Sequence, residues 1–97
     1  MSGLPLEFAQ GQMEATVRLA THVIVAAPKR ADGFDNRGAA YFFKGSDDAR
    51  AIADFTEAIR LNPRNAGFFK HRALIYRDKG DWARADADEA EAARLAR

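Results

Sequence analysis

The sequence predicts an all-α fold built from antiparallel helix pairs, and three observations support this prediction. Apolar residues recur at helical spacing, most clearly in residues 51–61, where Ile52 and Phe55 belong to one stripe. Pro28 and Pro63 each follow such a periodic segment, and proline cannot continue a helix. No stretch alternates polar and apolar residues, and no Asn-Gly hairpin signal is present, so strands are not expected.

The first helix is predicted over residues 12–27 and ends before Pro28. The preceding residues are less clear. Pro5 is compatible with the first turn of a short helix, which we expect Gly11 to break or end. Packing rather than helix propensity must hold residues 12–27, because the segment contains threonines and valines.

The second helix is predicted from Asp32, a suitable N-cap, to Lys44, with Gly45 as its C-terminal stop. Gly38 lies inside this helix. An interior glycine costs about 0.5–1 kcal/mol relative to alanine, so we expect a close helix crossing at this position.

Three further helices follow. One of Ser46, Asp47 or Asp48 is expected to cap the helix that runs to about Leu61, which Asn62-Pro63 ends. Asn65 is expected to cap the fourth helix, which Gly80 stops, and Asp81 to cap the last one, over residues 82 to about 96.

Composition favours a single soluble domain. The 97 residues are 47% hydrophobic, which is enough for a modest core. A net charge of +1 gives no general attraction to nucleic acid or to an anionic membrane, so neither is an expected partner. No apolar run is long enough to span a bilayer, and the start resembles no signal peptide. We expect a cytoplasmic location, or a periplasmic one if the N-terminus is processed.

Residues with catalytic or metal-binding patterns are lacking in the sequence. It has no cysteine, and its serines, Ser2 and Ser46, lie in no nucleophile motif. His22 and His71 have no second ligand at metal spacing, and the glycines form no phosphate-binding loop. The acidic residues on the helices are interpreted as solvated faces. We therefore expect no enzyme, no metal and no cofactor.

The chain contains an internal repeat of helix, tight turn and helix, with a period of about 34 residues. The turn and helix starting at Ala31 match those starting at Ala66. The matched pairs are Phe34 with Phe69, Gly38 with Ala73, Tyr41 with Tyr76, Gly45 with Gly80, Ala51 with Ala85, and Ala58 with Ala92. The connection between Gly45 and Ala51 is one residue longer than its counterpart.

These matched residues, together with Trp82 and the closing Pro63, resemble the tetratricopeptide repeat family over residues 11–96. The resemblance implies a short right-handed α-solenoid of about two and a half repeats. Residues 1–28 would be a partial first repeat, 29–63 the second and 64–97 the third. Residues 82–97 turn acidic where another repeat would pack, so they are interpreted as a C-terminal cap or, alternatively, as a degenerate final helix.

The resemblance also implies a non-enzymatic protein-interaction module that holds a peptide or helix of a partner in a concave groove. Carried over to this sequence, the groove residues are Asp35, Asn36, Ala39, Phe43, Lys70, His71, Leu74 and Arg77. Lys70 and Arg77 either hold a partner's carboxylate or pair with Asp78 or Asp35.

Other side chains leave alternatives open. Arg37 and Arg72 are expected to pack their stems and to reach solvent or an acid. One member of each aromatic doublet, at residues 42–43 and 68–69, is expected in the core and the other at the surface.

The alternative function is self-association, because the first repeat lacks most of its first helix. Two and a half repeats are fewer than a stable stack usually needs. The uncovered face of residues 12–27, with Met13, Val17 and Ile24, would then contact another copy. A third possibility, an RNA-binding solenoid, is disfavoured by the near-neutral charge.

Overall fold

The computed structural model describes residues 6–44 and 47–97, with side chains for 11–43 and 47–97. Over these ranges the chain forms five α-helices and no strand, which confirms the predicted all-α fold class. The helices are α1 (Leu6–Ala26), α2 (Ala31–Lys44), α3 (Asp48–Leu61), α4 (Ala66–Asp78) and α5 (Trp82–Leu95).

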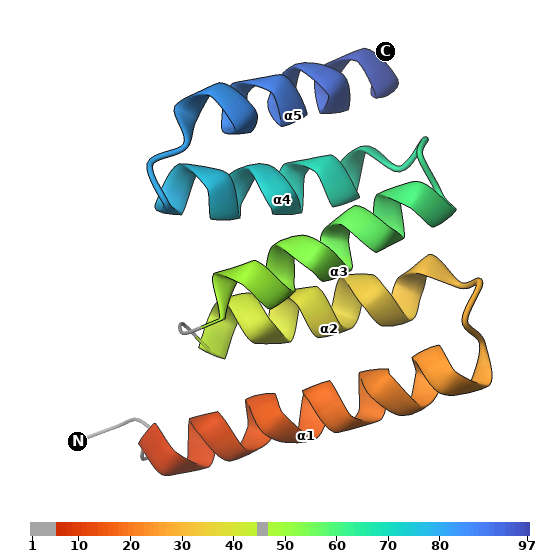
Figure 1. Cartoon of the computed structure of the whole chain (residues 1–97), viewed down its shortest axis with the longest axis vertical. Coiled ribbons are helices and arrows are strands. Elements are labelled where there is room, and N and C mark those ends of the chain that lie inside the picture. The colour runs from red at the N-terminus through yellow and green to blue at the C-terminus, as the bar shows by residue number, and fades with distance from the viewer. Residues whose placement is uncertain (1–5, 45–46) are drawn as a thin grey trace.

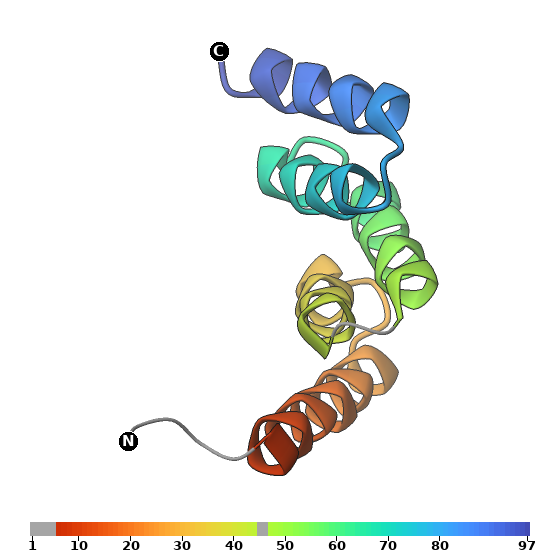
Figure 2. The ribbon, with the colours of Figure 1, turned by 90° about the vertical axis from the view of Figure 1, so that its left-hand side faces the viewer.

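Successive helices run antiparallel and stack along the long axis of the molecule (Figure 1). Each helix packs against the next one in the chain, and α2 also contacts α4. Turned by 90°, the stack shows α2 and α4 on one side of α3, with α1 and α5 at its two ends (Figure 2). The molecule is 22 Å thick along its shortest axis, which is about two helix diameters. The core is therefore a thin layer between neighbouring helices.

Helix α1 is longer than the sequence predicts. A break at Gly11 is expected, but one continuous helix runs from Leu6 to Ala26 through this glycine. The free-energy cost of one interior glycine is about 1 kcal/mol, which a long helix tolerates. No atom lies within 4 Å of the place that a Cβ atom at Gly11 would occupy, so helix packing does not explain the presence of this glycine.

Short polar side chains begin three of the helices as predicted. Asp47 accepts a hydrogen bond from the Arg50 backbone N–H, Asn65 from that of Gly67, and Asp81 from that of Arg84. The prediction for α2 is wrong: the helix begins at Ala31, so Asp32 lies in its first turn and is not its N-cap. A carboxylate there interacts favourably with the positive end of the helix dipole.

Glycine ends α4 as predicted, because Gly80 has a φ of +80°, a conformation that L side chains rarely adopt. The corresponding predictions for Gly45 as a stop and Ser46 as a cap lie outside the described residues.

The core forms around Phe55 and Ile75, the largest fully buried side chains among the described residues. Gly38 of α2 lies against the face of the Phe55 ring, and a side chain at this position would come within 3.1 Å of the ring. The expected close crossing is therefore present. Four buried alanines of the second helix in each pair let the neighbouring helices approach: Ala51, Ala58, Ala85 and Ala92.

The two aromatic doublets differ. Phe43 is exposed and Phe42 is partly buried, as expected for the first doublet. The expectation is wrong for the second, because Phe68 and Phe69 are both buried. Phe68 packs against Ala31 and Ala58 on one side of α4. A helix with neighbours on two sides buries adjacent residues that point about 100° apart.

Candidate functional site

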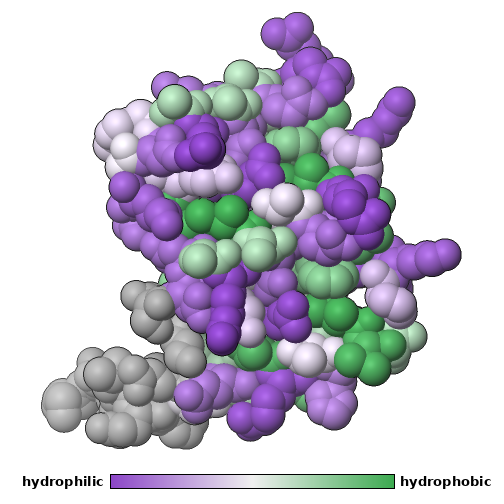
Figure 3. All heavy atoms as spheres, viewed as in Figure 1, coloured by the Kyte–Doolittle hydropathy of each residue, from purple (hydrophilic) through white to green (hydrophobic). Residues whose placement is uncertain are grey.

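The eight predicted groove residues lie on the two inner helices, α2 and α4, which stand on the same side of α3 (Figure 2). Asp35, Asn36, Ala39 and Phe43 come from α2, and Lys70, His71, Leu74 and Arg77 from α4. We call this surface the α2/α4 face. On its opposite side, with α3 in front of α2 in Figure 1, hydrophilic side chains predominate, and apolar ones show between them and most openly at the lower right (Figure 3).

A polar contact joins the two helices in the middle of the α2/α4 face. The Nδ1 atom of His71 lies 2.8 Å from a carboxylate oxygen of Asp35, within hydrogen-bond distance. The His71 ring also packs at 5.4 Å, centroid to centroid, from the Phe55 ring of α3. These contacts link α4 to α2 and α3 at His71.

A hollow of about 380 Å³ opens between α1 and α2, and we call it the N-terminal hollow. It is lined by Met13, Thr16, Leu19, Ala20 and Val23 of α1 and by Asn36, Ala39, Ala40 and Phe43 of α2. No charged side chain lines it. Leu19 is 68% exposed and Phe43 71% exposed, and Val23 is exposed too. Clustered exposed apolar residues of this kind mark interaction surfaces more often than scattered ones do.

A second hollow of about 460 Å³, the C-terminal hollow, opens between α4 and α5. It is lined by Lys70, Ala73, Leu74 and Arg77 of α4 and by Glu89, Ala92, Ala93 and Ala96 of α5. Alanines form its floor, and charges stand at its edge. Arg77 forms ion pairs with Glu89 and, at 3.7 Å, with Asp86. The predicted partners Asp35 and Asp78 are therefore not the ones that Arg77 takes.

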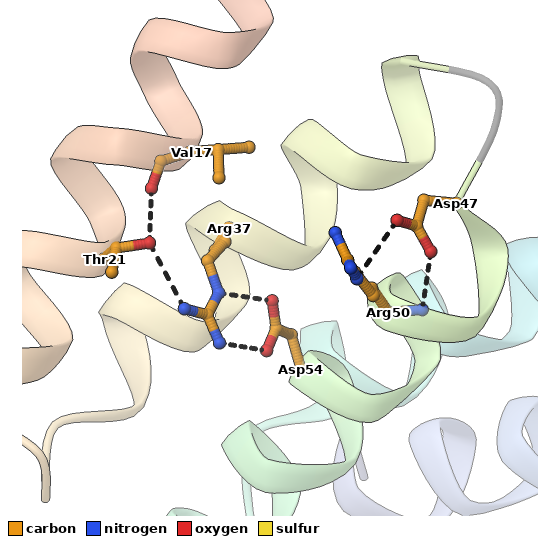
Figure 4. Close-up of polar contacts among 6 residues, drawn as sticks. All are labelled: Val17, Thr21, Arg37, Asp47, Arg50 and Asp54. Carbon is orange, nitrogen blue, oxygen red and sulfur yellow. Dashed lines mark hydrogen bonds and ion pairs between the residues drawn. The ribbon is translucent and has the colours of Figure 1, made fainter.

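Two arginines connect the helices below the surface. The Nε and Nη2 atoms of Arg37 donate to both carboxylate oxygens of Asp54, at 2.8 and 2.9 Å, and Nη1 donates to Thr21 at 3.2 Å (Figure 4). This group links α2 to α3 and α1. Hydrogen bonding to Asp54 raises the pKa of the Arg37 guanidinium, although burial opposes the shift. The Asp54 side chain is buried, so its interpretation as a solvated residue is wrong.

The same arrangement recurs one unit later. Arg72 of α4 donates to both oxygens of buried Asp88 on α5 and to Thr56 of α3. Each arginine follows its threonine by 16 residues. Arg37 precedes its aspartate by 17 residues and Arg72 precedes its own by 16, which confirms the one-residue insertion between α2 and α3.

Aromatic side chains cover both arginines. The Arg37 guanidinium lies 5.9 Å from the Phe34 ring centroid and 6.0 Å from that of Tyr41. Arg72 is placed in the same way between Phe69 and Tyr76. The aromatic residues that define the sequence repeat therefore support a buried ion pair, and cation–π attraction adds to its stability. Because both arginines are fully engaged, we assign them a structural role.

The three residues predicted for self-association lie at different places on α1. Met13 lines the N-terminal hollow, whereas Ile24 packs against Gly33 of α2. Val17 is partly buried, and its carbonyl accepts a hydrogen bond from Thr21 (Figure 4). Sequence reasoning did not assign Leu19 and Val23 to this surface, although both are exposed and line the N-terminal hollow. Their position on the stripe facing α2 gives no sign of exposure, since exposure depends on which neighbouring helix is present.

Among the described residues no buried side-chain nitrogen or oxygen lacks a hydrogen-bond partner. The same residues contain no cluster of three or more His, Asp or Glu side chains arranged for a metal ion. None of the described helices combines the length and hydrophobicity that crossing a membrane requires.

No protein-family model matches the chain, and no curated protein matches it at a significant level.

Proposed function

We propose that the chain is a protein-interaction module that holds a helix or peptide of another protein on the α2/α4 face. The observation that carries the proposal is the pair of apolar-floored hollows beside α2 and α4, which contain exposed Phe43 and Leu74. A few anchor side chains that become buried at the centre of an interface carry most of its binding energy, and binding sites are usually concave and largely apolar.

The resemblance to tetratricopeptide repeats supports this proposal, since that resemblance implies binding along the inner helices. The polar contact between His71 and Asp35 keeps α2 and α4 in fixed relative positions. A surface that is already ordered loses little conformational entropy on binding, which favours affinity.

The test is a selection of helical and extended peptides from a displayed library against the full chain. The affinity of each selected peptide is then measured for Phe43→Glu and Leu74→Glu variants. Val25→Glu is the matched control, because Val25 is exposed but lines neither hollow. We expect about a tenfold or greater loss of affinity for the first two variants and none for the control. Affinity unchanged in both test variants would exclude the α2/α4 face.

Self-association is the second candidate, favoured by the exposure of Leu19 and Val23 on α1. In that case the wild-type chain is a dimer in size-exclusion chromatography with light scattering, and Leu19→Glu makes it a monomer. A wild-type chain that remains monomeric at high concentration excludes this alternative.

A further inference from the structure

The N-terminal hollow has a structural counterpart inside the molecule. Helix α1 ends at Ala26 and α2 begins at Ala31, just as α3 ends at Leu61 and α4 begins at Ala66. The two helix pairs can therefore be aligned in sequence at these ends. In this register four residues of α1 correspond to the four buried residues of α3: Thr16 to Ala51, Leu19 to Asp54, Ala20 to Phe55, and Val23 to Ala58.

Helix α2 contributes to the burial of that α3 surface. Gly38 lies on the Phe55 ring, Arg37 binds Asp54, and Ala31 packs against Ala58. The corresponding residues of α1 all line the N-terminal hollow. Between α3 and α4 the equivalent space is filled by α2, which contacts both helices. Among the described residues, therefore, no helix takes on α1 the role that α2 has on α3.

We infer that the N-terminal hollow binds one amphipathic helix of another polypeptide, which packs on α1 as α2 packs on α3. The inference rests on the proposed function in that it takes the partner to be a polypeptide. It deepens that function by assigning the N-terminal hollow, at the end of the stack, to one helix, and it specifies the side chains that this hollow accepts.

Two differences between α1 and α3 determine the chemistry of the bound helix. Leu19 replaces Asp54, so the helix needs an apolar residue where α2 has Arg37. A buried arginine without a carboxylate would lose its compensating charge. Ala20 replaces Phe55, which leaves the volume of an aromatic ring unfilled. The helix therefore needs a large apolar residue where α2 has Gly38.

A second copy of the chain does not supply such a helix in its folded state. Its α2 and α4 already lie between neighbouring helices. Its α5 has an open side, but Asp86 and Glu89 on that helix are exposed and acidic, whereas the N-terminal hollow has no cation among its lining residues. An apolar helix from a different polypeptide fits the hollow better.

The C-terminal hollow is not an equivalent site. Glu89 occupies the place of Phe55 there and pairs with Arg77, and Ala90 takes the place of Thr56. A following helix would have neither the aromatic contact nor the threonine acceptor that α4 uses on α3.

The test uses fluorescein-labelled peptides of residues 31–44, with a short C-terminal lysine tail for solubility. One peptide has the unaltered sequence, and the other carries Arg37→Leu and Gly38→Leu. Fluorescence anisotropy with the full chain measures both affinities. We expect the altered peptide to bind at least about tenfold more tightly. Equal affinities, or no binding of the altered peptide, would overturn the inference.

A Leu19→Asp variant gives the sharper comparison, because it restores the carboxylate that Arg37 binds inside the fold. Leu19 is largely exposed, so the variant is expected to fold. The preference should reverse, with the unaltered peptide now binding more tightly. An unchanged order of affinities would contradict the proposed position of the helix.

A Lys70→Glu variant separates this inference from the proposed function. Lys70 lies in the C-terminal hollow, away from α1, so its replacement should leave both peptide affinities within about twofold.

Partners selected for the α2/α4 face are measured in parallel. If Leu19→Asp leaves intact the binding of those partners that depend on Leu74 while it reverses the peptide preference, the two hollows bind their ligands independently. A dimer in light scattering that Leu19→Asp dissociates and that the altered peptide does not displace would instead assign the hollow to a second copy and overturn the inference.

Discussion

At the level of single residues, the buried arginine–aspartate pairs join neighbouring helices of the stack. Arg37 connects α2 to α3 through Asp54 and to α1 through Thr21, and Arg72 repeats this between α3, α4 and α5. Such pairs contribute little net stability when compared with apolar residues of the same size, but breaking one is costly. Their value here is that they fix the register of neighbouring helices.

Replacing Asp54 with asparagine tests this role. The change leaves the Arg37 guanidinium partly buried without its countercharge, so we expect the free energy of unfolding to fall by about 2–3 kcal/mol. The double variant Arg37→Met with Asp54→Leu removes both charges and should lose clearly less than Asp54→Asn alone. Urea denaturation followed by circular dichroism measures both. A single variant as stable as the wild type would show that the pair is unimportant.

Acid sensitivity is expected at Asp81, the N-cap of α5. Hydrogen bonds from the Arg84 side chain and backbone N–H lower the pKa of this carboxyl below its ordinary value of 3.8. A pKa depressed in the folded state means that the stabilisation is fully present above the unfolded pKa and is lost as pH falls through the folded pKa.

Asp81→Asn keeps an oxygen that accepts the capping hydrogen bond but removes the titration. We therefore expect the difference in melting temperature between wild type and variant to be constant near neutrality. It should shrink from about pH 4 downwards. Thermal unfolding at a series of pH values checks this expectation, and a difference that grows on acidification would contradict it.

At the scale of the helix, two glycines differ in their surroundings. Gly38 lies against the Phe55 ring, whereas no atom lies within 4 Å of the place that a Cβ atom at Gly11 would occupy. Gly38→Ala should gain helix propensity but crowd a fully buried ring, with a net loss of about 1–2 kcal/mol. Gly11→Ala is the matched control and should gain about 0.5–1 kcal/mol. Chemical denaturation measures the free energy of unfolding of both variants. A Gly38→Ala variant more stable than the wild type would contradict the close crossing of α2 and α3.

Helices and their caps are largely predictable from the sequence because the signals are local. Pro28 and Pro63 follow their helices, and Asn65 and Asp81 cap theirs, whatever the rest of the chain does. The prediction at Gly11 is wrong because a single glycine is a weak signal inside a long helix. Burial is less predictable, because it depends on neighbours that are distant in sequence.

Asp54 and Leu19 illustrate that limit at the same position of two equivalent helices. Asp54 is charged yet buried, since Arg37 reaches it from α2. Leu19 is apolar yet exposed, since no helix covers it within the described chain. A pattern of residue types identifies the stripe that faces a neighbour, but it does not say whether the neighbour is there. The same pattern therefore places the predicted groove residues on the inner helices without predicting their burial.

For the whole molecule, the important feature is that no described helix covers the N-terminal hollow. The ladder of threonine, arginine and aspartate passes through all five helices of the described chain. It stops at Leu19, where an aspartate would bind the next arginine, and at Ala90, where a threonine would accept from it. The C-terminal end carries charges at the edge of its hollow, whereas the N-terminal hollow is lined by uncharged side chains.

The most direct test is a nuclear magnetic resonance titration of the full chain with the peptide of residues 31–44 that carries Arg37→Leu and Gly38→Leu. A helix bound in the N-terminal hollow should shift the backbone amide signals of Leu19, Val23 and Phe43 and leave those of the C-terminal hollow, at Leu74 and Ala93, unchanged. Shifts centred on α4 and α5, with α1 unaffected, would contradict the account.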